Sequence, residues 1–133
     1  MKIFDCTTFY SEDLMMDLRF NILNDYVEKF IVCESTISHS GNKKKLNFDI
    51  NNYSKFKDKI TYIIIDEEPE GIVGQKNGLA EPHEKRSDSL KRINLSYDYM
   101  IKAISDASDN DLIMLSDNDC LLYTSDAADD VRG

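Results

Sequence analysis

Short apolar runs alternate with longer amphipathic stretches along this chain, and this alternation predicts its fold. Four runs predict β-strands, at residues 3–6, 30–33, 60–65 and 112–115. The second and fourth are continuous apolar runs, which is typical of strands covered on both faces, and the third is rich in β-branched residues. The first two runs are separated by an amphipathic helix, an order that implies a parallel pair with a right-handed crossover. The pattern therefore predicts an α/β fold, a mostly parallel sheet with flanking helices.

Two helices are predicted between these strands. Ser11 offers an N-cap, and Glu12 and Asp13 place negative charge in the first turn of a helix that runs to about Val27. An apolar stripe recurs along it every four residues, at Leu14, Leu18, Ile22 and Tyr26. The second helix carries a stripe formed by Leu90, Ile93, Tyr97, Met100, Ile101 and Ile104. Both stripes are expected to face the sheet.

Two polar segments are predicted to lack regular structure. Residues 34–58 contain Ser-Gly and Asn-Asn turn signals and a lysine triplet, which indicate a loop or a loosely structured insertion. Residues 71–85 contain three glycines and a proline without periodicity, which indicate a long loop.

The composition and net charge of the chain argue against several classes of protein. The 133 residues suffice for one domain, and a net charge of −9 disfavours a nucleic-acid-binding protein. No apolar run reaches the roughly 20 residues of a membrane-spanning helix, and the first residues do not form a signal peptide. Cys6, Cys33 and Cys120 have no ligand spacing, so reduced thiols and a cytoplasmic location are predicted.

The last fourteen residues continue none of these patterns. Residues 120–133 resemble translated sequencing adaptor, so we predict a domain at 1–119 followed by a non-native tail. On this interpretation the natural protein is longer, and the chain stops just after its fourth strand.

Asp117 and Asp119 form the strongest candidate site. They flank Asn118 directly after the fourth apolar run, at the carboxyl end of the sheet, where open α/β sheets bind ligands. Two carboxylates in a turn can hold one divalent cation together with substrate phosphates. In a chain with 25 acids the alternative is a pair of solvated acids. Arg92 is a second candidate, because its helix leads into this strand; the alternative is an exposed arginine whose stem covers apolar surface.

Five blocks occur along the chain in the order Met1–Cys6, Asp17–Arg19 with Leu23-Asn24, Val32–Glu34, His39–Gly41 and Leu112–Asp119. Together these blocks resemble glycosyltransferase family 17, the β-1,4-mannosyl-glycoprotein 4-β-N-acetylglucosaminyltransferases and their bacterial relatives. The family usually continues its acidic motif with Glu and then Ile-Pro, whereas Cys120 and Leu121 stand here. The difference agrees with a truncation at that point.

The resemblance implies a GT-A-like (Rossmann-like) fold and transfer of N-acetylglucosamine from a UDP-sugar donor to a glycan acceptor, as in N-glycan processing. It also implies that Asp119 ligates Mn²⁺ or Mg²⁺ at the diphosphate, with Asp117 near the ribose or the metal's water shell. No catalytic base is evident before Asp119, so the chain is expected to be inactive as a fragment. Eukaryotic members of the family are Golgi membrane proteins, but no anchor is visible in this sequence.

Glu34, His39 and Gly41 complete the predicted donor site. Glu34 follows the second strand at the same edge of the sheet, and Gly41 would permit a tight turn at 39–41. Both are expected to line the nucleotide pocket; the alternative is that Glu34 only caps a local turn. On the first interpretation Glu34→Gln weakens UDP-sugar binding by about 1 kcal/mol and leaves the melting temperature nearly unchanged.

Two other functions remain open from the residues alone. A strand-end aspartate can also serve a metal-dependent phosphoryl-transfer or phosphatase domain, although that class usually has its acidic motif near the chain start. The third possibility is a non-catalytic module that binds a nucleotide sugar. The sequence does not define the oligomeric state.

Overall fold

Four parallel strands form the sheet of this protein, as the apolar runs predicted. The computed structural model describes residues 1–72 and 82–117. Its elements, in chain order, are β1 (Ile3–Thr8), α1 (Asp13–Leu23), β2 (Lys29–Ser35), the 3₁₀ helix η1 (Ile50–Lys59), β3 (Ile60–Ile65), α2 (Pro82–Ala103) and β4 (Leu112–Asp117). The α/β class with flanking helices is therefore confirmed, and β3 begins and ends at the predicted residues.

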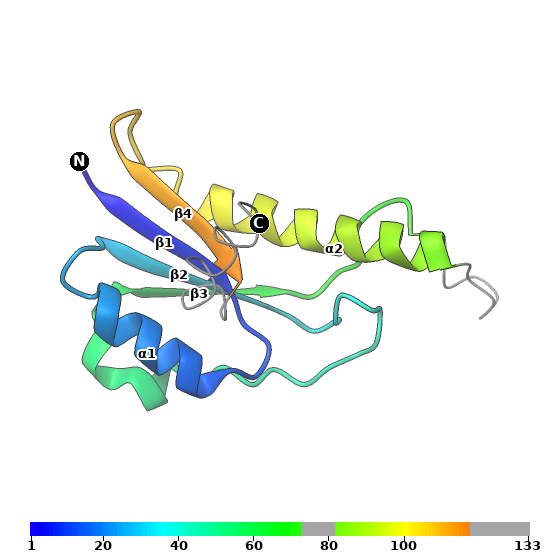
Figure 1. Ribbon diagram of the computed structural model, residues 1–133, viewed down its shortest axis with the longest axis horizontal. Helices are drawn as coiled ribbons and strands as arrows, with labels where there is room; N and C mark the ends of the chain where they lie inside the picture. The colour runs from blue at the N-terminus through cyan, green and yellow to red at the C-terminus, as the bar shows by residue number, and fades with distance from the viewer. Residues whose placement is uncertain (73–81, 118–133) are drawn as a thin grey trace, which may run out of the picture.

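The direction in which successive strands are added to the sheet reverses beside β1. The sheet runs β3-β2-β1-β4, so the chain moves outward from β1 to β3 and then returns to the other side of β1 (Figure 1). Thr8 at the end of β1 pairs with Asp117 at the end of β4. Ligands of open α/β sheets bind at such a reversal, at the carboxyl ends of the strands.

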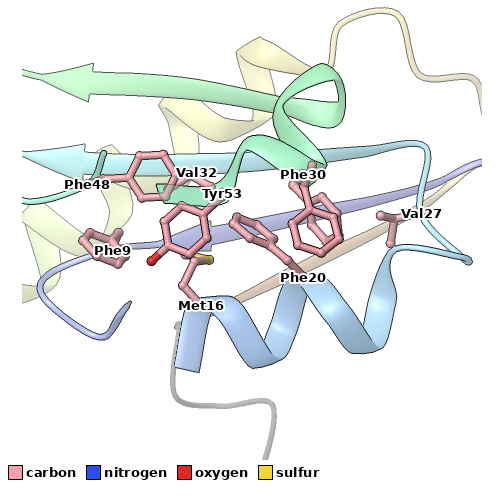
Figure 2. Packing of buried hydrophobic residues seen from close by; sticks show 9 residues of the cluster. Phe9, Met16, Phe20, Val27, Phe30, Val32, Phe48 and Tyr53 are labelled. Atoms are coloured by element: carbon pink, nitrogen blue, oxygen red, sulfur yellow. The ribbon is translucent and has the colours of Figure 1, made fainter. Parts of the chain in front are cut away.

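Helices cover both faces of the sheet, with α1 and η1 on one side and α2 on the other (Figure 1). Under α1 lies an aromatic cluster formed by Phe9, Met16, Phe20, Val27, Phe30, Val32, Phe48, Tyr53 and Phe56 (Figure 2). Phe20 is at its centre, with its ring centroid 4.7 Å from that of Phe30 and 5.1 Å from that of Tyr53, both in edge-to-face arrangement. Such pairs add about 0.5–1.5 kcal/mol each to the burial of the rings.

The polar segment 34–58 is not a loose loop, and the prediction was wrong over its second half. Asp49 accepts a hydrogen bond from the Asn51 backbone N–H and thereby caps η1. Tyr53 and Phe56 of η1 are buried against Phe20. The 3₁₀ helix was missed because these two aromatic residues are spaced by three and flanked by polar residues.

The buried face of α1 also differs from the predicted stripe. Met16, Arg19 and Phe20 are buried, whereas Leu14 is 80% exposed and Tyr26 is 70% exposed. The helix begins at Asp13, so Glu12 and not Ser11 is the N-cap residue, and it ends at Leu23. A charged residue occupies the centre of the buried face, and a search for apolar periodicity therefore selects the wrong side of the helix.

Polar residues also occupy the buried face of the second helix, α2, in its N-terminal half. Its most buried positions recur every four residues, at Asp88, Arg92, Ser96 and Met100. Of the predicted stripe, Met100 and Ile104 are buried, but Leu90 and Ile101 are about half exposed. The helix begins at Pro82, inside the segment predicted as a loop, because the fixed φ of proline suits the first turn.

The two cysteines in the described residues are reduced and buried in the core under α2. Burial, together with the neighbouring Asp5 carboxylate, raises the pKa of Cys6 to about 12. Burial beside Cys6 and Glu34 raises the pKa of Cys33 to about 12 as well. Cys120 lies outside the described residues.

We predict that neither buried thiol reacts in the folded protein. In a Cys120→Ser variant, a disulfide reagent at mildly alkaline pH should release no chromophore until denaturant is added, because the thiolate is the attacking species. Two equivalents should then react, one each from Cys6 and Cys33. A fast reaction of either thiol without denaturant would contradict the buried placement.

Candidate functional site

A cavity of about 580 Å³ lies at the carboxyl ends of three strands. Its floor comes from the last residues of β1, β2 and β3, at Thr8, Cys33, Ser35 and Ile65. The middle of α2 and the segments that follow the three strands complete the wall. A cavity of this size accommodates a small-molecule ligand and occupies the place where α/β sheets bind one.

Part of the buried polar face of α2 lies at this cavity. Arg92 and Ser96 line it, and Arg92 donates to both carboxylate oxygens of Glu68 at 3.0–3.2 Å. A further nitrogen of Arg92 donates to the His39 carbonyl at 2.9 Å, and the Ser89 hydroxyl donates to the same oxygen at 2.8 Å. The helix therefore holds the segments after β2 and β3 through polar contacts.

The turn that carries His39 is tight, as predicted. The Gly41 backbone N–H donates to the Ser38 carbonyl at 2.9 Å, and Ser38 N–H donates to the Asn42 carbonyl at 2.8 Å. Gly41 has φ +93°, a conformation that favours glycine. Because Arg92 and Ser89 both donate hydrogen bonds to the His39 carbonyl, the turn lies against α2 at the wall of the cavity.

Glu34 is fully buried beneath this region, and internal donors satisfy its carboxylate. One oxygen accepts from Lys44 Nζ at 2.7 Å and from the Asn47 N–H at 2.7 Å. The other accepts from the Tyr62 hydroxyl at 2.6 Å and from the Phe48 N–H at 3.0 Å. Glu34 thus holds the chain between β2 and η1, and its neighbours in sequence, rather than its own side chain, line the cavity.

The acidic motif lies only partly within the described residues. Asp117 is the last residue of β4, and its backbone pairs with Thr8, which lines the cavity. Asn118 and Asp119 lie outside the described residues. Within the described part of the chain, no three His, Cys, Asp or Glu side chains converge as a complete metal site. The metal role of Asp117 and Asp119 therefore stays a prediction, although the register places Asp117 at the expected edge.

Comparison with protein families matches residues 1–126 to the model of glycosyltransferase family 17. The chain belongs to this family. No curated protein and no solved structure shows significant similarity to it. In the described residues of this family 17 chain, no helix is both long enough and apolar enough to cross a membrane.

Most of the charged side chains identified at the cavity of the family 17 domain already form ion pairs or hydrogen bonds within the protein. Arg92 is bound to Glu68, and Lys44 donates to Glu34 and to the Ser35 carbonyl. Lys44 Nζ also lies 5.2 Å from the centroid of the Tyr10 ring, which is half exposed at the cavity. The cavity therefore presents cations whose charge is already balanced by glutamates.

Of the residues predicted from the sequence, the structure brings His39 and Arg92 together on one wall, whereas Gly41 lies in the same turn without lining the cavity. Sequence reasoning missed Glu68, which pairs with Arg92 from 24 residues away, and the exposed Tyr10 ring. The acids at 66–68 follow a predicted strand at the same edge of the sheet, and that position was the available signal for Glu68.

Proposed function

We propose that this family 17 domain transfers N-acetylglucosamine from UDP-N-acetylglucosamine to a glycan acceptor. Family membership supports glycosyl transfer over the phosphatase alternative. The observation that carries the assignment of the donor site is the cavity at the strand ends, beside the backbone position of Asp117. Its volume of about 580 Å³ lies within the range of roughly 300–1,000 Å³ of small-molecule sites.

We also propose that a divalent cation, Mn²⁺ or Mg²⁺, is held by Asp117 and Asp119. The two basic side chains identified at the cavity, Lys44 and Arg92, are already paired with Glu34 and Glu68. A diphosphate there would meet little uncompensated positive charge from the described residues. Carboxylate oxygens at the adjacent strand end fit a hard cation. When bound, such a cation stabilises the negative charge that develops on the leaving nucleoside diphosphate.

The chain's own residues have distinct roles in this proposal. Arg92 and His39 form one wall of the donor site, and Gly41 closes the turn that carries His39. Glu34 positions Lys44 and the backbone around it, in place of the direct ligand contact that the sequence suggested. The backbone of Asp117, at the end of β4, pairs with Thr8 at the end of β1 and so lies at the same edge of the sheet as the cavity.

The proposal predicts that Mn²⁺ and UDP bind cooperatively. Calorimetry should show UDP binding at least tenfold more tightly with Mn²⁺ than without it, because the diphosphate supplies ligands that two carboxylates lack. Asp119→Ala should abolish this difference. Asp109→Ala, which removes an exposed acid in the turn before β4, is the matched control and should behave as the wild type. Equal affinity for UDP with and without Mn²⁺ in the wild type would refute the metal site.

A further inference from the structure

The ion pair between Arg92 and Glu68 lies in the wall of the cavity, since both residues line it. Nε and Nη2 of Arg92 donate to the two carboxylate oxygens of Glu68 at 3.0–3.2 Å. The third guanidinium nitrogen, Nη1, donates to the His39 carbonyl at 2.9 Å. The guanidinium is therefore held at two independent points, one on an acid and one on a backbone carbonyl.

Glu68 differs in exposure from Asp5 and Glu34, the acids of two other ion pairs. The Asp5 and Glu34 side chains are 0% exposed, so a ligand has no access to them. The Glu68 side chain is 31% exposed, whereas that of Arg92 is 6% exposed. A buried guanidinium needs a counter-anion. Here that counter-anion is in contact with the cavity, so another anion can replace it.

A phosphate group has the right chemistry to replace Glu68. The planar guanidinium binds two phosphate oxygens through the same pair of N–H groups with which it binds a carboxylate. Because Nη1 stays on the His39 carbonyl, the exchange moves Glu68 toward solvent and leaves Arg92 in place. The released carboxylate is hydrated, and the charge of the guanidinium stays balanced throughout.

From this geometry we propose that Glu68 competes for Arg92 with the diphosphate group of the nucleotide donor, and that this competition sets the specificity of the cavity. The inference rests on the proposed donor site. A diphosphate supplies the counter-charge that Arg92 gives up when Glu68 leaves, but a nucleoside or a neutral sugar does not. The pair thus favours diphosphates over uncharged ligands of similar shape.

Titration calorimetry with UDP, in the absence of divalent cations, tests the exchange in Glu68→Gln. The Kd of UDP should fall about fivefold, because a neutral amide competes less strongly for the guanidinium. The Kd of uridine, which has no phosphate, should stay at the wild-type value. Glu67→Gln is the matched control, since Glu67 also lines the cavity but accepts from the Tyr99 hydroxyl at 2.5 Å. It should change the Kd of UDP less than about twofold.

Two further variants connect the gain in affinity to Arg92. Glu68→Asp shortens the acid but keeps its charge, so it should lower the Kd of UDP by less than Glu68→Gln does. Arg92→Lys, added to Glu68→Gln, removes the two-pronged donor and should cancel the gain. An equal gain in Glu67→Gln, an equal gain for uridine, or a gain that survives Arg92→Lys would each overturn the proposal. So would an unchanged Kd of UDP in both Glu68 variants, and Glu68→Asp decides alone if Glu68→Gln does not fold.

Inorganic pyrophosphate separates this inference from the proposed function. If the wild type binds no UDP with or without Mn²⁺, the proposed donor function fails. A Kd of pyrophosphate about fivefold lower in Glu68→Gln than in the wild type would then still support the exchange on Arg92. An unchanged Kd of pyrophosphate would refute the exchange as well.

Discussion

Asp5→Ala should lower the free energy of unfolding by about 3–5 kcal/mol, one of the largest effects of any single substitution in this domain. Removing the carboxylate leaves the Arg19 guanidinium buried without its counter-charge and without two hydrogen bonds of 2.6 and 2.7 Å. Equilibrium unfolding in urea, followed by circular dichroism, measures the loss as a lower midpoint with an unchanged slope. Asp25→Ala, at an exposed position just after α1, should stay within about 0.5 kcal/mol of the wild type.

The double variant Asp5→Leu with Arg19→Met separates the charge effect from packing. Apolar residues of similar volume remove both buried charges, and such replacements are often neutral or stabilising. The double variant should therefore be clearly more stable than Asp5→Ala, and the effects of the two sites should not add. A stability of Asp5→Ala equal to that of the wild type would show that Asp5 does not balance Arg19.

The strands could be predicted from sequence because each depends on a local property. Residues 60–65 form a continuous β-branched and aromatic run, and β3 occupies the same residues. The faces of the helices could not be predicted in this way. Arg19 is buried in an ion pair with Asp5, fourteen residues earlier, and apolar periodicity contains no information about that pair.

In the candidate site, too, some features could be predicted from the sequence and others could not. The edge of the sheet and the turn at Gly41 follow from strand order and from glycine's access to positive φ. The role of Glu34 depends on the backbone N–H groups of Asn47 and Phe48, which reach it only once the intervening chain has folded. The position of Glu34 in the sequence placed it at the correct edge of the sheet. It could not show that four donors within the protein already form hydrogen bonds to the Glu34 carboxylate.

Glu34→Gln should therefore destabilise the fold, by about 3 kcal/mol, where the sequence suggested a nearly unchanged melting temperature. A carboxylate accepts from all four donors, but a glutamine amide has one oxygen. In either orientation its NH₂ group faces a backbone N–H, that of Asn47 or that of Phe48. Lys44, which is 8% exposed, also loses its buried counter-charge. Thermal unfolding of the two proteins measures the difference, and Glu28→Gln, at an exposed position before β2, is the matched control.

The stability gap between wild type and Glu34→Gln should shrink at acidic pH. Burial raises the pKa of Glu34, but hydrogen bonds from Lys44, Tyr62 and the two backbone N–H groups outweigh it and lower the pKa below its ordinary value of 4.5. Because the folded-state pKa lies below the unfolded one, the carboxylate contributes its full stability above pH 4.5 and loses it as the pH falls through the folded value. Glutamine does not titrate, so urea midpoints of the two proteins should converge on acidification. A gap that stays constant from neutral pH to well below 4.5 would show that the charge of Glu34 does not hold this loop.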